Sequence, residues 1–213
     1  KLEIATTGFT AVRIAGGDGN SQQVRFHGAT QENASLYSYY NAGSPYFSVY
    51  NNGTEGMRID SVGRVTMPNQ PAFRAGRSGN YSPVGTSSNC LFNTTSIVGG
   101  GNVGNHYNTT TGVFTAPVSG FYSFTTIVLW MNVPDGQDMS DSFRFNVNSS
   151  MCQYSWRRAE YVNTSTGNGG YYSDFASIQL FLAASDAVSV RLQKTQDIHG
   201  NAEYTTFTGY LVG

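Results

Sequence analysis

Apolar and polar residues alternate in short stretches along the first third of the chain, and turns rich in glycine and asparagine separate these stretches. Successive side chains of a β-strand point to opposite faces, so the alternation predicts strands of about three to five residues. These strands are expected at residues 12–14, 24–26, 36–40, 46–50, 57–59 and 64–67. Glycine and asparagine accept the positive φ of tight turns, so neighbouring strands are expected to form hairpins.

The pattern changes after residue 68, where the apolar stretches become longer and nothing in them asks for a helix. Strands are expected near residues 72–75, 94–98, 113–116, 120–131, 142–147, 151–157, 171–182, 187–194 and 205–212. Strands of this number and spacing favour a two-layer antiparallel sandwich. Pro68 and Pro71 mark a boundary between two domains, residues 1–68 and 69–213, of an all-β protein.

The first domain has few large aliphatic residues. A stretch of about 70 residues with no disulfide and no metal site buries too little surface to offset the entropy of its chain. Three copies wound together would place the alternate apolar residues of each copy on one shared axis, so an intertwined trimeric β shaft is predicted. A floppy linker is the alternative, and the regular alternation argues against it.

The charge balance narrows the possible partners. The chain has 12 Lys and Arg against 13 Asp and Glu, so its net charge of -1 provides no basic field for nucleic acid or anionic lipid. No apolar run reaches the roughly 20 residues that cross a bilayer, so membrane insertion is not expected. Cys90 and Cys152 are too few for a disulfide framework, and they are interpreted either as two buried thiols or as one bridge.

Several motifs of the second domain resemble the globular head of complement C1q. Its signature spacing is carried by Asn102, Tyr107, Phe114, Gly120, Tyr122 and Phe124. The first and last strands of that family are similar to residues 71–75 (Pro-Ala-Phe-Arg-Ala) and 207–211 (Phe-Thr-Gly-Tyr-Leu). The resemblance implies a C1q/TNF-like jelly roll that assembles as a homotrimer. Its aromatic core is expected to contain Phe114, Tyr122, Phe124, Phe207 and Tyr210.

A second resemblance lies in the first domain. Residues 56–63 read Gly-Met-Arg-Ile-Asp-Ser-Val-Gly, which is similar to a phrase common in the shafts of bacteriophage tail fibres and tailspikes, just before a C-terminal tip. This resemblance implies an extracellular fibre segment of a virion, with further fibre upstream of Lys1. The C1q-like head would then both nucleate trimerisation and bind a receptor on the bacterial surface.

The sequence contains no Gly-x-Ser-x-Gly elbow, no phosphate-binding loop and no His-Glu-x-x-His, so no enzyme activity and no cofactor are expected. Residues 135–138 form an acidic loop that is either a plain turn or a site for Ca²⁺, which prefers oxygen ligands. Acids that would have to pair for glycoside cleavage are scattered. They are Asp135, Asp138, Asp141, Asp174, Asp186 and Glu203.

Bacterial surface glycans are held by aromatic faces beside hydrogen-bonding side chains, so two aromatic loops are candidates for the receptor site. The candidate receptor-binding residues are Trp156, Arg157, Arg158, Tyr161, Tyr171 and Tyr172. The alternative is that Trp156 belongs to the core and the arginines pair with acids across the trimer interface. Residues 196–204 form a third candidate, which is polar but chemically unspecific.

The function predicted from these observations is a trimeric phage tail fibre that recognises a bacterial surface receptor, expected to be a saccharide, without catalysis. One alternative is a secreted, non-viral C1q-like recognition or adhesion protein. The other is a tailspike that depolymerises polysaccharide.

Overall fold

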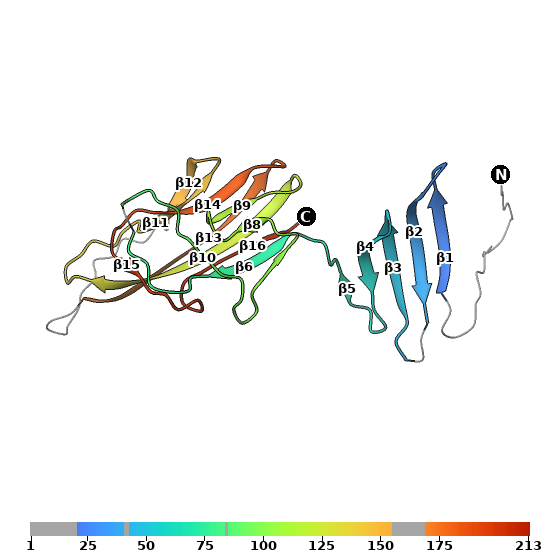
Figure 1. Cartoon of the computed structure of the whole chain (residues 1–213), viewed down its shortest axis with the longest axis horizontal. Helices are drawn as coiled ribbons and strands as arrows, with labels where there is room; N and C mark the ends of the chain where they lie inside the picture. The colour runs from blue at the N-terminus through green and yellow to red at the C-terminus, as the bar shows by residue number, and fades with distance from the viewer. Residues whose placement is uncertain (1–20, 41–42, 84, 155–168) are drawn as a thin grey trace, which may run out of the picture. The chain divides into compact units, whose positions relative to one another are not determined.

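A computed structural model describes residues 21–40, 43–83, 85–154 and 169–213. The chain divides into two compact units, Lys1–Asn69 and Gln70–Gly213. All elements of the described residues are strands, β1 to β16, and none of these residues is helical (Figure 1). The predicted all-β class is therefore confirmed. The strand predicted at residues 12–14 lies outside the described residues.

The first unit is an antiparallel sheet in which strands adjacent in sequence are adjacent in space. Its strands are β1 (Ser21–His27), β2 (Glu32–Tyr39), β3 (Tyr46–Asn51), β4 (Thr54–Ile59) and β5 (Val65–Thr66), in the order β1-β2-β3-β4-β5. Asn52 and Gly53 join β3 to β4, and their φ angles of 49° and 73° are both positive, as a type I′ hairpin turn requires. The intertwining of three such units stays a prediction.

One face of this sheet is apolar. The register aligns Val24, Leu36, Val49 and Met57 across four strands, and Phe47, Ile59 and Val65 in a second row. Phe26 and Val65 on this face are 54% and 56% exposed. Among the side chains that the structure describes in this unit, only Ser35 and Ser48 are buried. The described part of the first unit therefore contains no hydrophobic core.

The opposite face carries a cluster of aromatic rings, Tyr37, Tyr39, Tyr46 and Tyr50, whose centroids lie 5.4–6.3 Å apart. Arg58 Nη2 lies 2.6 Å from Glu55 Oε2, and the Arg58 guanidinium stacks over the ring of Tyr46 at 4.1 Å from its centroid. The hydrogen bond from Arg58 holds the pKa of Glu55 below its ordinary value. The two faces of the sheet thus differ sharply in polarity.

The second unit is a sandwich of two antiparallel sheets, as predicted. The strands of the first sheet, in order, are β13 (Gly170–Leu182), β10 (Gly120–Val133), β16 (Thr206–Leu211), β6 (Ala72–Gly76) and β7 (Gly101–Val103), and β15 (Asp197–Ile198) pairs with β10. The second sheet runs β12 (Ser150–Tyr154), β11 (Phe143–Val147), β14 (Ala187–Leu192), β9 (Val113–Thr115) and β8 (Tyr107–Asn108). This strand order is that of a jelly roll, as predicted.

The prediction of a strand at residues 94–98 is wrong. Only Thr94 makes a β-bridge, with Gly76. The chain then turns, because the backbone N–H of Ser96 donates to Thr94 Oγ1 at 3.1 Å and that of Gly100 donates to the Ile97 carbonyl at 2.8 Å. Local hydrogen bonds of this kind compete with strand pairing.

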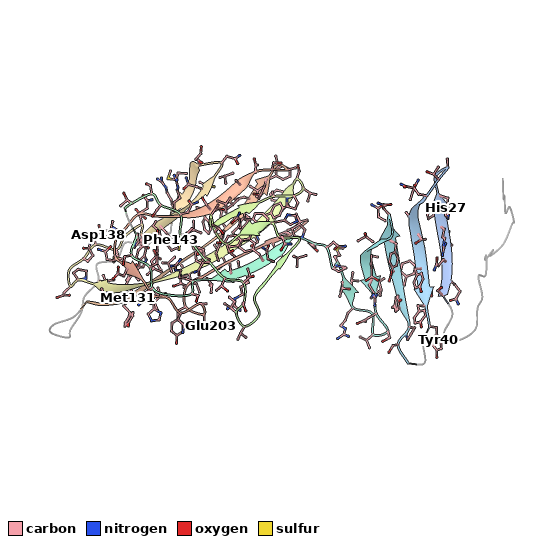
Figure 2. The ribbon with its side chains drawn as sticks, in the orientation of Figure 1. His27, Tyr40, Met131, Asp138, Phe143 and Glu203 are labelled. Atoms are coloured by element: carbon pink, nitrogen blue, oxygen red, sulfur yellow. The ribbon has the colours of Figure 1, made fainter. Side chains whose placement is uncertain are left out.

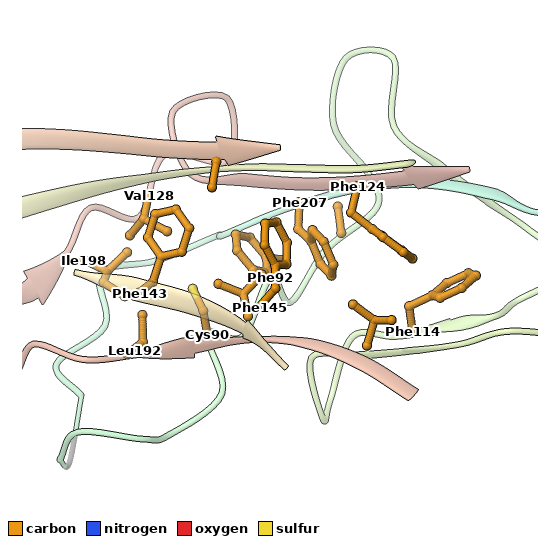
Figure 3. Close-up of a cluster of buried hydrophobic side chains, with 14 of the residues drawn as sticks. Cys90, Phe92, Phe114, Phe124, Val128, Phe143, Phe145, Leu192, Ile198 and Phe207 are labelled. Atoms are coloured by element: carbon orange, nitrogen blue, oxygen red, sulfur yellow. The ribbon is translucent and has the colours of Figure 1, made fainter. Parts of the chain in front are cut away.

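Aromatic rings from both sheets meet in the core of the second unit (Figure 3). Phe124 of β10 packs edge-on against Phe114 of β9 at 5.4 Å, and Phe207 of β16 lies 6.2 Å from Phe145 of β11. Four of the five predicted core residues are fully buried, whereas Tyr210 is 49% exposed. Tyr210 is three positions from Phe207 on the same strand, so its side chain points to the outer face.

Candidate functional site

Tyr171 and Tyr172 are the two predicted receptor-binding residues that the structure describes; Trp156, Arg157, Arg158 and Tyr161 lie outside the described residues. Consecutive side chains of a strand point to opposite faces, and these two tyrosines stand at the start of β13. Tyr172 is 9% exposed and belongs to the core between the sheets, while Tyr171 is 60% exposed on the outer face. Of these two described tyrosines, only Tyr171 therefore presents its ring at the surface.

The ring of Tyr171 is the first of a row of three. Its centroid lies 5.6 Å from that of His199, which lies 5.9 Å from that of Tyr204. His199 and Tyr204 belong to residues 196–204, the third candidate segment of the sequence. The fold therefore brings one predicted aromatic residue to a loop that the sequence marked only as polar.

Tyr204, the last ring of this row, lines a hollow of about 340 Å³ on the outer face of the first sheet. The hollow is lined by Ile127, Leu129, Ser173, Glu203 and Tyr204. Leu129 is paired with Ser173 across β10 and β13, so both side chains point to the same face. Met131 of β10 and Glu203 are labelled on the lower side of the second unit in Figure 2.

Hydrogen bonds hold the loop against β10. The N–H of His199 donates to the Leu129 carbonyl at 2.8 Å, and the N–H of Leu129 donates to Thr205 Oγ1 at 3.2 Å. Asn201 Oδ1 accepts the N–H of Glu203 at 2.8 Å, which fixes the turn that presents this carboxylate. The rim of the hollow is thus anchored at several points.

Glu203 is positioned by a neighbouring loop. Its Oε1 accepts the N–H of Val98 at 3.1 Å, and its Oε2 lies 3.4 Å from Arg74 Nη2. The side chain is still 41% exposed, and a carboxylate has about four lone-pair sites, so it can accept further hydrogen bonds. Arg74 offsets part of its negative charge.

His199 offers a hydrogen-bond donor. Its Nδ1 accepts the N–H of Asn201 at 3.1 Å, so the hydrogen of the neutral imidazole is on Nε2. The hollow itself combines an aliphatic floor, the ring of Tyr204, the hydroxyl of Ser173 and the carboxylate of Glu203. This arrangement suits a ligand with both C–H faces and hydroxyl groups.

Two of the acids considered for glycoside cleavage hold the fold together. Asp174 is 1% exposed and accepts the hydroxyl of Ser142 at 2.8 Å, and that Ser142 Oγ accepts Trp130 Nε1–H at 3.2 Å. Asp186 accepts bonds from Asn148 and from the backbone of Ala183, which lower the pKa of its carboxyl. These two carboxylates have structural partners already in place.

The acidic loop at residues 135–138 contains an ordinary turn, in which Asp138 Oδ1 accepts the N–H of Ser140 at 2.8 Å. Within the described ranges, no three His, Cys, Asp or Glu side chains are grouped as a metal site would need. The same ranges include no helix with the length and apolar character to span a bilayer.

Both cysteines are free thiols, so the bridge considered from the sequence does not form. Cys90 is buried, and its burial raises the pKa of the thiol to about 12. Cys152 is exposed on β12, so the prediction of a buried thiol is wrong there.

A sequence profile of the C1q domain matches residues 72–212. Among solved structures, the chain is similar to the globular domain of zebrafish complement 1qA protein, with 16% identity and a TM-score of 0.46 over 68% of this chain and 98% of that one. It is also similar to Eiger TNF from S. frugiperda, with 13% identity and a TM-score of 0.41 over 68% and 94% of the two chains. It is similar as well to murine APRIL, with 11% identity and a TM-score of 0.44 over 67% of this chain and 99% of that one.

Proposed function

This chain belongs to the C1q domain family, and from that premise we propose that it is a homotrimeric segment of a bacteriophage tail fibre. In this proposal the segment is extracellular, continues a longer fibre, and binds a bacterial surface receptor through its head without catalysis. The observation that carries the proposal is that, among the described residues, each unit leaves an apolar sheet face uncovered. Faces of this kind mark surfaces that another protein covers.

In the first unit the apolar rows of β1 to β5 have no second layer among the described residues. Three copies that turned these rows toward a common axis would bury them and leave the tyrosine face in water. The phrase Gly-Met-Arg-Ile-Asp-Ser-Val-Gly at residues 56–63 supports a phage shaft through its resemblance to such shafts, and it covers the end of β4 and the turn into β5. These features favour the fibre over a secreted, non-viral C1q-like adhesion protein, which remains the second candidate.

In the second unit the outer face of the first sheet has a ridge and a hollow. Phe121 and Phe181 form the ridge, with centroids 5.3 Å apart and side chains 55% and 63% exposed. A second hollow of about 350 Å³ lies across β6, β7 and β16, and its lining includes Ala72, Gly101 and Tyr210. A ridge and a hollow on different parts of one face suit a head-to-tail contact that closes as a three-fold ring.

Light scattering on the full chain tests the proposal. We expect a mass near three times 23.0 kDa, and we expect Phe121→Ser together with Phe181→Ser to shift the protein toward smaller species. Met151→Ser is the matched control, because Met151 is 52% exposed on the other sheet. A wild-type chain with the mass of a stable monomer would overturn the trimer, and with it the fibre.

A further inference from the structure

The outer face of the second sheet is the part of the head that the proposed contact between copies leaves open. The ridge at Phe121 and both hollows lie on the outer face of the first sheet, on the far side of the core. We infer that the second sheet binds the carboxylate or phosphate group of an acidic saccharide through Arg144 and Arg191. The inference rests on the proposed receptor-binding function and adds the class of ligand and the place where it binds.

The two arginines stand directly opposite each other on adjacent strands. Arg144 of β11 is paired with Arg191 of β14 in the register of the sheet, and these strands lie side by side (Figure 1). Their neighbours Phe145 and Val190 are fully buried in the core, so both arginine side chains point to the outer face. Opposed residues of an antiparallel pair have Cβ atoms about 4.5–5.5 Å apart, so one ligand group can reach both guanidiniums.

The charge of this sheet is unbalanced. As the structure describes them, the five strands β8, β9, β11, β12 and β14 contain two arginines, no lysine, no aspartate and no glutamate. Like charges directly opposite each other destabilise an antiparallel pair. An anion bound to both guanidiniums would add two attractions that offset this repulsion. A neutral ligand would leave the repulsion in place, so the pair favours an anionic one.

Arg191 is held in place and keeps donors for a ligand. Its Nε–H donates to Asn89 Oδ1 at 3.4 Å, and Asn89 Nδ2 donates to the Thr111 carbonyl at 3.0 Å. The bond to Asn89 uses one N–H of a planar fork, so the terminal nitrogens of Arg191 can still donate. Such a fork matches the paired oxygens of a carboxylate or a phosphate.

The surroundings of the two arginines suit a saccharide. Ser189 and Thr115 carry hydroxyls at outward positions of β14 and β9, and Asn108 carries an amide at an outward position of β8. Thr115 and Asn108 are exposed. Hydroxyls and amides both donate and accept hydrogen bonds, as the ring hydroxyls beside the acidic group of a sugar require.

Binding of the full chain to three immobilised polymers with one backbone tests the inference: carboxymethyl dextran, phosphorylated dextran and neutral dextran. We expect at least one acidic dextran to bind about tenfold more tightly than dextran, a scale that one hydrogen bond to a charged group reaches. The two acidic polymers distinguish a carboxylate ligand from a phosphate. The affinity should fall as salt rises from about 0.05 M to about 0.5 M, because salt screens exposed charges.

Arg144→Gln together with Arg191→Gln removes both charges, and we expect it to lower the affinity for the acidic dextran to near that for dextran. Arg25→Gln together with Arg64→Gln is the matched control, because it removes the same charge from the first unit and should leave the affinity unchanged. Arg191→Lys keeps the charge but loses the planar fork, so it should weaken binding by less than the double variant does. Light scattering on each variant checks that assembly is unchanged.

Equal binding of neutral and acidic dextrans would overturn the inference. So would equal effects of the two double variants, which would assign the binding to net charge. If no dextran binds to a chain whose mass is three times 23.0 kDa, the inference falls and the trimer stands. Selective binding by a monomer that depends on Arg144 and Arg191 would instead remove the trimer and keep the anion site.

Discussion

The two units of this chain use β-strands in opposite ways. In the second unit, two sheets face each other and bury a continuous set of aromatic and aliphatic side chains. In the first unit, one sheet has an apolar face and a tyrosine face, and serines are its only buried side chains among those described. Alternation and turns are enough to pair strands, but a hydrophobic core needs a second layer. In the proposed trimer, the first unit obtains that layer from other copies.

The largest loss of stability should come from truncating a side chain in the core of the second unit. Phe207 contacts Phe73, Phe92 and Phe124, so Phe207→Ala should lower the free energy of unfolding of this unit by about 3–5 kcal/mol. Urea unfolding followed by tryptophan fluorescence measures it, because both tryptophans lie in residues 70–213. Phe47→Ala in the first unit should leave this transition in place. Similar losses from the two variants would erase the contrast between the units.

The second-largest loss of stability should come from removing the buried hydroxyl of Ser142. Ser142→Ala removes the partner of both Trp130 Nε1–H and the Asp174 carboxylate, and leaving buried polar groups unsatisfied costs about 1–3 kcal/mol. The same unfolding experiment measures the change. Ser61→Ala, at an exposed turn of the first unit, is the control. A Ser142→Ala variant as stable as the wild type would show that water replaces the hydroxyl.

The hairpin turn of the first unit should be sensitive to backbone conformation alone. Gly53 has φ of +73° and no atom within 4 Å of an added Cβ, so Gly53→Ala should destabilise the hairpin by about 1–2 kcal/mol. Gly56→Ala is the matched control, because its φ is not in the left-handed region and its nearest neighbour, the Val49 carbonyl, is 3.7 Å away. Amide hydrogen exchange in β3 and β4 measures the stability of the hairpin in both variants. Equal exchange rates in the two variants would contradict a strained turn.

The smallest effect concerns the ion pair on the tyrosine face. The pKa of Glu55 is lowered in the folded protein, so its stabilisation is present above its unfolded pKa and is lost as pH falls through the folded value. Arg58 is 38% exposed, so solvent screening limits the contribution to below about 1 kcal/mol. Glu55→Gln should remove this pH dependence, measured by amide exchange of β4 between neutral and acidic pH. An unchanged pH profile would assign the dependence to other carboxyls.

Much of the fold follows from local patterns in the sequence. Period-2 alternation predicts the strands from β1 to β4, and the Asn52-Gly53 pair predicts the hairpin that joins β3 to β4. The same alternation would have placed Tyr210 outside the core, because residues three positions apart on a strand point to opposite faces and Phe207 is buried. The turn at residues 94–98 is wrongly predicted as a strand because β-branched residues favour strands. Here a side-chain hydrogen bond of Thr94 stabilises a turn instead.

The candidate site is less accessible to sequence reasoning. Tyr171 is recognisable as an aromatic residue near a glycine-rich loop, and the alternation of β13 could have separated it from Tyr172. Its contact with His199 depends on the pairing of β10 with both β13 and β15. The floor residue Ile127 reads as one more apolar strand position. Contacts between strands distant in sequence are fixed by the topology.

The claim that the first unit owes its fold to neighbouring copies is tested most directly by amide hydrogen exchange over a range of protein concentrations. Across the dissociation of the proposed trimer, β2 and β3 should change from protected to freely exchanging, while β10 stays protected in both states. Amides of β2 and β3 that remain equally protected in a 23.0 kDa monomer would contradict the claim.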